Sequence, residues 1–236
     1  MKMFVSLCAM SAALGIGTSD AVPQARAGQG WSVLTARTLG KNENSLHVQA
    51  GWPGVSATVI HGMSPRLDVG GIFSFNYGLE GDVNDVEPGI KLQGLARIKL
   101  SDTGRFNFGL TFAPGPLLYF GHSRTLLGII LPAGLVFGIP ASPSVNISLG
   151  ADIPFWFYVT QGGGAAIPIL FGGGVEYFID RNMAVTFNTR MGPMIFTGGT
   201  RTFCTATYLG WGCYDTSVPS YSDFALQASI GVAARL

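Results

Sequence analysis

Hydrophobic and polar residues alternate along several stretches of the chain, which is the pattern of β-strands with one apolar and one polar face. In RLDVGGIFSFNY (residues 66–77), Phe73 and Phe75 lie on one face, and Asp68 and Asn76 on the other. The same alternation runs through residues 45–52, 89–100, 105–112, 145–153 and 223–236. Weaker patterns predict strands at 54–62, 126–138, 166–180 and 183–197. The pattern therefore predicts about ten strands, within a range of 8–12.

The predicted connections alternate between short and long. The short ones are residues 63–65, 101–104, 139–144 and 180–182, and the long ones are residues 79–88, 113–125, 160–166 and 198–220. Tight turns at one end and long loops at the other are typical of outer-membrane barrels. In a soluble β-sandwich, short and long connections would not be expected to alternate so regularly. We therefore expect the apolar faces to point outward to lipid and the polar faces to point into a lumen.

Composition supports a lipid environment. Charged residues make up 11% of the 236-residue chain, against about a quarter in ordinary soluble domains, and mean hydropathy is +0.37. A transmembrane helix at residues 126–140 is the alternative, but that stretch is short and Pro132 interrupts it. Residues 31–39 (WSVLTARTL) would give an odd strand count, so we expect them to lie along the periplasmic rim or to enter the lumen.

The N-terminus has the features of a cleaved secretory signal peptide. Lys2 precedes a short apolar run, and Ala25-Arg26-Ala27 forms an A-x-A cleavage signature, so residues 1–27 are predicted to be removed. An uncleaved membrane anchor is the alternative. The remaining chain has as many basic as acidic residues. It carries no basic excess to hold a phosphate backbone, so nucleic acid is not an expected partner.

The C-terminal strand carries the most specific resemblance. Ser229, Gly231, Ala234 and Leu236 match the spacing at the end of Gram-negative outer-membrane β-barrel proteins, although those chains usually end in phenylalanine. The resemblance implies an all-β, transmembrane up-and-down antiparallel β-barrel over residues 44–236, preceded by a lead-in segment at 28–43. It also implies an outer-membrane location, contact with lipid and lipopolysaccharide, and recognition by the barrel-assembly machinery through the last strand.

A set of charged residues is predicted to face the lumen. It comprises Arg66, Asp68, Lys91, Arg97, Lys99, Arg105, Glu176, Arg190, Asp223 and Arg235. These residues could form a cationic constriction that favours anionic or zwitterionic solutes. They could instead form ion pairs that fill a narrow barrel, because ten strands leave little interior space. Because the interior is narrow, we favour the interpretation in which ion pairs fill the barrel.

The longest predicted loop, residues 197–221, combines a cysteine pair with aromatic residues. Cys204 and Cys213 are predicted to form a disulfide, because the chain is exported and a metal site would need more ligands. The aromatic residues Phe203, Tyr208, Trp211 and Tyr214 could contact a partner or carbohydrate. They could equally belong to the aromatic girdle at the outer membrane surface.

Catalytic signatures such as HExxH, GxSxG or a phosphate loop do not occur in the sequence. We therefore expect no enzymatic activity, no cofactor and no metal site. The sequence predicts a narrow channel or a structural surface barrel, and the alternative is a surface interaction module that acts through the 197–221 loop.

Overall fold

The computed structural model describes residues 30–78, 88–120, 125–160, 164–197, 200–207, 210–217 and 220–236. For residues 200–207 and 210–217, only the backbone is described. The predicted signal peptide and nearly all of the 79–88 loop lie outside the described residues.

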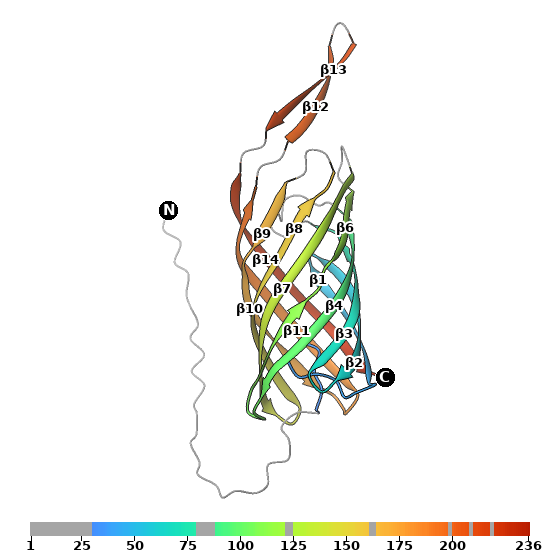
Figure 1. Cartoon of the computed structure of the whole chain (residues 1–236), viewed down its shortest axis with the longest axis vertical. Helices are drawn as coiled ribbons and strands as arrows, with labels where there is room; N and C mark the ends of the chain where they lie inside the picture. Colours follow the sequence, from blue (N-terminus) through green and yellow to red (C-terminus); the bar gives the residue numbers. More distant parts are fainter. Residues whose placement is uncertain are drawn as a thin grey trace, which may run out of the picture.

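The protein is a closed antiparallel barrel with ten strands around its wall, as the alternation predicted (Figure 1). The first and last strands pair and close the wall, from Ser45 opposite Arg235 to Trp52 opposite Ala228. In wall order, the strands are β1 (Asn44–Trp52), β2 (Gly54–Ser64), β3 (Leu67–Asn76), β4 (Gly89–Asp102), β5 (Asn107–Phe112) with β6 (Gly115–Phe120), β7 (Thr125–Ser142), β8 (Val145–Tyr158), β9 (Ala165–Pro168) with β10 (Leu170–Phe178), β11 (Met183–Phe196) and β14 (Tyr221–Arg235).

Two wall positions are each shared by two shorter strands. β5 and β6 both lie between β4 and β7, and β9 and β10 both lie between β8 and β11. A proline on the neighbouring strand faces each interruption. Between β5 and β6, next to Pro114, the Ala113 N–H donates to the Pro132 carbonyl. Between β9 and β10, the Ile169 N–H donates to the Pro193 carbonyl. Proline has no N–H to return such a bond, so the ladder is interrupted there.

This arrangement corrects the prediction of a long loop at residues 113–125. Residues 115–120 form β6, which pairs with β4 and β7 and continues the wall position of β5. The pairing adds no eleventh or twelfth position to the barrel. The loop prediction was wrong because two prolines and two glycines in the segment indicate a turn, whereas the wall on both sides imposes an extended strand.

The outward and inward faces are those that the alternation predicted. Phe73 and Phe75 are 50% and 40% exposed on the outside, whereas Asp68 and Asn76 face the lumen and are buried. We call the end of the barrel that carries the short connections and the C-terminus the turn end, and the opposite end the loop end (Figure 1). An apolar belt therefore surrounds the wall between them, as in membrane barrels.

A separate hairpin extends beyond the loop end of the barrel (Figure 1). It consists of β12 (Thr200–Thr207) and β13 (Gly210–Ser217), which pair with each other and form a two-stranded sheet apart from the wall. Among the described residues, no helix has the length and hydropathy to cross a membrane.

Candidate functional site: the barrel lumen

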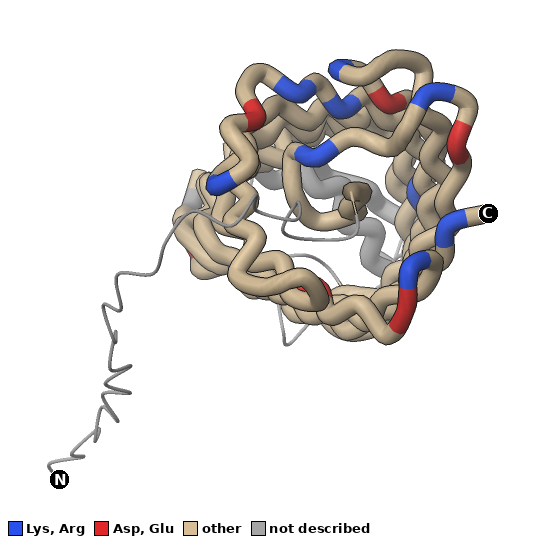
Figure 2. The backbone as a smooth tube through the Cα atoms, turned by 90° about the horizontal axis from the view of Figure 1, so that it is seen from below, with Lys and Arg blue, Asp and Glu red and all other residues tan. Residues whose placement is uncertain are grey.

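Residues 31–39, which we call the plug, enter the lumen at the turn end. The view into that end shows the chain crossing the opening inside the ring of strands (Figure 2). Trp31 and Ala36 have no exposed surface and Leu39 is 1% exposed. Of the two positions considered from the sequence, the structure shows entry into the lumen. The plug therefore occupies the turn end of the lumen.

The wall makes room for the plug with inward-facing glycines. A Cβ at Gly109 on β5 would lie 2.8 Å from Ala36 Cβ, and one at Gly138 on β7 would collide with Thr35 Cβ. A real Cβ contact is essentially never shorter than 3.0 Å, and the added Cβ atoms would also lie 2.4 Å from the Ile98 carbonyl oxygen and 2.4 Å from Asn107 Oδ1, so any side chain at these positions would displace the plug, the wall or both. Wall and plug are therefore complementary in shape, which would be unexpected of a lead-in lying loosely in a pore.

A buried ion pair on adjacent wall strands holds one end of the plug. Arg97 on β4 donates from Nη2 and Nε to Asp68 Oδ2 on β3, at 2.5 and 3.0 Å, and both residues are at most 2% exposed. Asp68 in turn accepts the backbone N–H of Leu39 at 3.2 Å, and Arg97 Nη1 donates to the Thr35 carbonyl at 3.3 Å. Each charge thus has both an ionic partner and a plug backbone partner, as a buried ion pair requires.

A second carboxylate holds the plug from the opposite side of the barrel. Glu176 on β10 is fully buried, accepts the Val33 N–H at 2.9 Å and accepts Asn146 Nδ2 at 3.1 Å. Nearby, the Trp31 ring packs edge-on against Phe178 and its Nε1–H donates to the Arg181 carbonyl at 2.9 Å. The plug therefore bridges β3 and β4 to β10 across the lumen.

The loop end of the lumen is filled by a different kind of packing. A cluster of buried apolar side chains, which we call the apolar seal, comes from consecutive strands on one side of the wall: Leu117 and Tyr119 (β6), Ile130 (β7), Trp156 (β8), Ala166 (β9), Leu170 (β10), Met194 (β11) and Ala225 (β14). The facing inner wall is polar, with Ser74 and Asn76 on β3 and Lys91 and Gln93 on β4. Asn76 Nδ2 donates to Tyr119 Oη at 3.0 Å and joins the two sides. An apolar interior departs from the polar lumen usual in membrane barrels.

Polar side chains occupy the lumen between the plug and the apolar seal. Arg190 Nε donates to Asp152 Oδ2 at 2.6 Å, His47 Nε2 lies 2.9 Å from Thr186 Oγ1, and Gln49 Nε2 donates to Ser56 Oγ at 2.9 Å. Asp152, which lies in the alternating stretch 145–153 but not in the predicted charge set, is thus the partner of Arg190. These contacts join β8 to β11 across β10, β1 to β11 across β14, and the neighbouring strands β1 and β2. Polar side chains from several parts of the wall thus fill the middle section of the lumen.

The structure divides the predicted charge set into separate groups. Asp68 pairs with Arg97, Lys99 lies 3.5 Å from Asp102, Arg190 pairs with Asp152, and Arg235 pairs with Glu43. Lys91 is buried in the lumen. Glu176 is buried and binds the plug backbone, as described above. The other three predicted lumen residues are exposed: Arg66 and Arg105 lie in connections at the turn end, and Asp223 lies near the loop end of β14. Arg66 and Arg105 are corrections, because each lies in a connection, where the alternation of the adjoining strand no longer fixes the side. Asp223 lies directly opposite the buried Met194 in the register of β14 and β11, so its position is on the inward face, at the exposed loop end.

The backbone register of the hairpin sorts the predicted loop residues. Cys204 lies directly opposite Cys213, and Phe203 directly opposite Tyr214. Directly opposed residues share a face and successive residues alternate, so the cysteine positions and the Phe203–Tyr214 positions fall on opposite faces. Trp211 falls on the cysteine face, and Tyr208 lies outside the described residues.

Sequence could have indicated the apolar seal but not the plug contacts. In LLGIILP (126–132) and PFWFY (154–158) both faces of the strand are apolar, and this loss of alternation marks strands that meet apolar surroundings on both faces. The plug residues show no such signal. Their positions depend on glycines and carboxylates far away in the sequence.

Comparison with known proteins supports the class defined by this geometry. No protein-family model and no curated protein sequence matches the chain. Among solved structures, it is similar to the outer-membrane protease OmpT from Escherichia coli, with a TM-score of 0.50 and 7% sequence identity over 86% of this chain and 100% of that one. At this identity the likeness concerns the fold alone. The chain therefore has the fold of an outer-membrane-type β-barrel.

Proposed function

We propose that the protein is a structural surface barrel of the outer membrane, without catalytic activity, whose lumen is closed instead of forming an open channel. The observation that carries this proposal is the burial of residues 31–39 inside the barrel, where Asp68, Arg97 and Glu176 bind their backbone. A ten-strand interior is narrow to begin with. With a plug at one end and an apolar seal at the other, it offers no continuous water-filled path.

The apolar outer belt supports the proposed location. Leu135, Leu149, Phe187 and Ile230 are each at least 41% exposed on the outside of the wall, a surface that suits lipid and not water. The turn end would face the periplasm and the loop end the lipopolysaccharide layer, with the last strand presented to the assembly machinery. Outer-membrane fractionation and heat-modifiable gel migration are the expected results. Recovery as a detergent-free soluble periplasmic protein would contradict the location.

Single-channel recording of the purified full-length protein in planar bilayers tests closure. We expect no stable conductance steps from the wild type. Arg97→Met should loosen the plug, yet the apolar seal should keep this variant silent as well. Arg97→Met combined with Met194→Gly should conduct if both closures act independently. Steady conductance by the wild type would contradict the closed barrel while leaving the location intact.

A protease is the enzymatic rival, because the similar structure is a protease. In the described part of this chain, however, the two histidines lie in the turn-end half: His47 bonds to Thr186 and His61 Nδ1 lies 2.8 Å from Asn44 Oδ1. Neither is joined to a nucleophile and an orienting carboxylate, which a catalytic site would need. Incubation of the purified barrel with a mixed peptide library, analysed by mass spectrometry, should show no cleavage. Specific cleavage would overturn the non-catalytic proposal.

The hairpin favours a second candidate function, binding of a partner or carbohydrate at the cell surface. β12 and β13 pair only with each other within the described sheets, and they extend away from the wall (Figure 1). A glycan array probed with intact barrel tests this function, with a variant whose residues 200–217 are replaced by a short Gly-Ser linker as the control. Binding that requires the hairpin would support it. Equal signals from both proteins would contradict it.

A further inference from the structure

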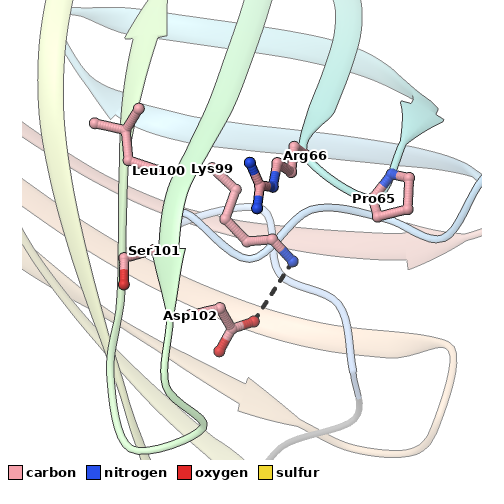
Figure 3. Close-up of a pocket in the computed structure, with 6 residues that line it drawn as sticks. All are labelled: Pro65, Arg66, Lys99, Leu100, Ser101 and Asp102. Carbon is pink, nitrogen blue, oxygen red and sulfur yellow. Dashed lines mark ion pairs between the residues drawn. The ribbon is translucent and has the colours of Figure 1, made fainter.

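Two adjoining hollows lie at the turn end, outside the lumen closure. Their volumes are about 390 and 530 Å³, and Pro65, Lys99 and Asp102 line both, so together they form one surface depression that we call the turn-end basin. Arg66 lines the first hollow, and Arg37 of the plug lines the second. The close-up shows the Arg66 and Lys99 side chains directed into the same space, with Asp102 below them (Figure 3).

Positive charge exceeds negative charge in the turn-end basin. Asp102 is the one carboxylate among the lining residues, against the three cations Arg37, Arg66 and Lys99. Lys99 Nζ lies 3.5 Å from Asp102 Oδ2, and Arg37 Nη2 lies 4.0 Å from Asp102 Oδ1. Both separations exceed the 2.7–2.9 Å, roughly, of a strong charge-assisted hydrogen bond. Asp102 therefore leaves much of the hydrogen-bonding capacity of the Lys99 ammonium unused.

The two outer cations are held side by side by the backbone. The Lys99 N–H donates to the Arg66 carbonyl at 2.8 Å, which fixes the connection between β2 and β3 against β4. Arg66 is exposed and has no ion-pair partner within the described residues. A ligand would thus meet a guanidinium and an ammonium whose backbones are already positioned, and this lowers the ordering cost of binding.

We infer that the turn-end basin is a binding site for a multivalent oxyanion, with Arg66 and Lys99 as its principal ligands and Arg37 as a third. A planar guanidinium can donate two parallel hydrogen bonds to a carboxylate or phosphate, and the neighbouring ammonium supplies a second point of charge. Because Arg37 belongs to the plug and Thr38 Oγ1 donates to the Pro65 carbonyl at 2.9 Å, a bound anion would also join the plug to the turns.

Calorimetric titration of the full-length protein in non-ionic detergent at low, constant ionic strength tests the site. Citrate and inorganic phosphate serve as separate probes, so that the two arms tell carboxylate from phosphate recognition. We expect saturable binding of at least one probe, and about two- to fivefold weaker binding for Arg66→Gln or Lys99→Gln, because each removes one partly exposed charge contact. Asp102→Asn should bind more tightly, since the competing carboxylate is gone.

Arg105→Gln is the matched control. Arg105 is an exposed cation in the connection after β4, but it does not line either hollow. Its removal should leave affinity unchanged, and heat-modifiable migration should show that every variant is folded. Equal loss in the Arg105 and Arg66 variants would mean a diffuse charge effect, and would overturn the site, as would a wild type that binds neither probe. None of these results depends on whether the barrel conducts.

Discussion

The two ends of the lumen are filled by different chemistry. At the turn end, the plug backbone is held by buried charges that come from β3, β4 and β10, while Trp31 and Leu39 of the plug pack in an apolar cluster with wall residues. At the loop end, the wall strands themselves supply apolar side chains that pack on one another. At the turn end every buried charge needs a partner, so removing one partner should strongly lower the free energy of unfolding. At the loop end the side chains fill a volume, so the loss of free energy of unfolding should grow with the size of the cavity that a substitution creates.

The largest expected effect is at the plug. Arg97→Met leaves the Asp68 carboxylate buried without its cation, which should lower the free energy of unfolding by about 3–5 kcal/mol. Denaturant unfolding in detergent micelles, followed by tryptophan fluorescence, measures this loss.

A paired substitution separates charge from packing at the same place. In Asp68→Asn with Arg97→Met no buried charge is left unpaired, and the asparagine carbonyl can still accept the Leu39 N–H. Most of the lost stability should return. A double variant as unstable as Arg97→Met alone would mean that the ion pair is not what holds the plug.

In the apolar seal, Met194→Ala should cost about 2–5 kcal/mol, because Met194 has no exposed surface and its truncation opens a cavity. Met194→Leu nearly conserves the volume and is the matched control, with an expected cost below about 1.5 kcal/mol. The same denaturant series measures both. If Met194→Ala and Met194→Leu were equally damaging, the seal would not depend on filled volume.

The outer wall gives the next effect. Leu135 lies near the middle of β7 and is 41% exposed on the outside, so Leu135→Arg should cost about 2–4 kcal/mol if it meets the lipid midplane. Ser229→Arg places the same side chain inward, at a half-buried lumen position, and should cost much less. Unfolding in lipid vesicles distinguishes the two. Equal losses would contradict the assignment of the outer face to lipid.

The contrast between the two closures also shows how far sequence alone could go. Alternation placed Phe73 outward and Asp68 inward correctly, because successive side chains of a strand point alternately to lipid and to the lumen and must therefore alternate between apolar and polar. Alternation could not pair Asp68 with the Leu39 N–H, since that bond joins an irregular segment to a strand 29 residues away. It also misplaced Arg66 and Arg105, because a side chain in a turn is free of the alternation of the adjoining strand.

The smallest expected effect on the barrel comes from the hairpin. Cys204 and Cys213 lie directly opposite each other on β12 and β13, a register that suits the predicted disulfide in an exported protein. Closing so short a loop should stabilise by at most about 3 kcal/mol on the chain-entropy account. The hairpin forms its own sheet, so this stabilisation should stay local. Replacing both cysteines with serine should therefore speed amide hydrogen exchange within residues 200–217 and leave the heat-modifiable barrel unchanged. Free thiols that titrate in the non-reduced protein would contradict the disulfide, and failure of the serine variant to assemble would contradict its confinement to the hairpin.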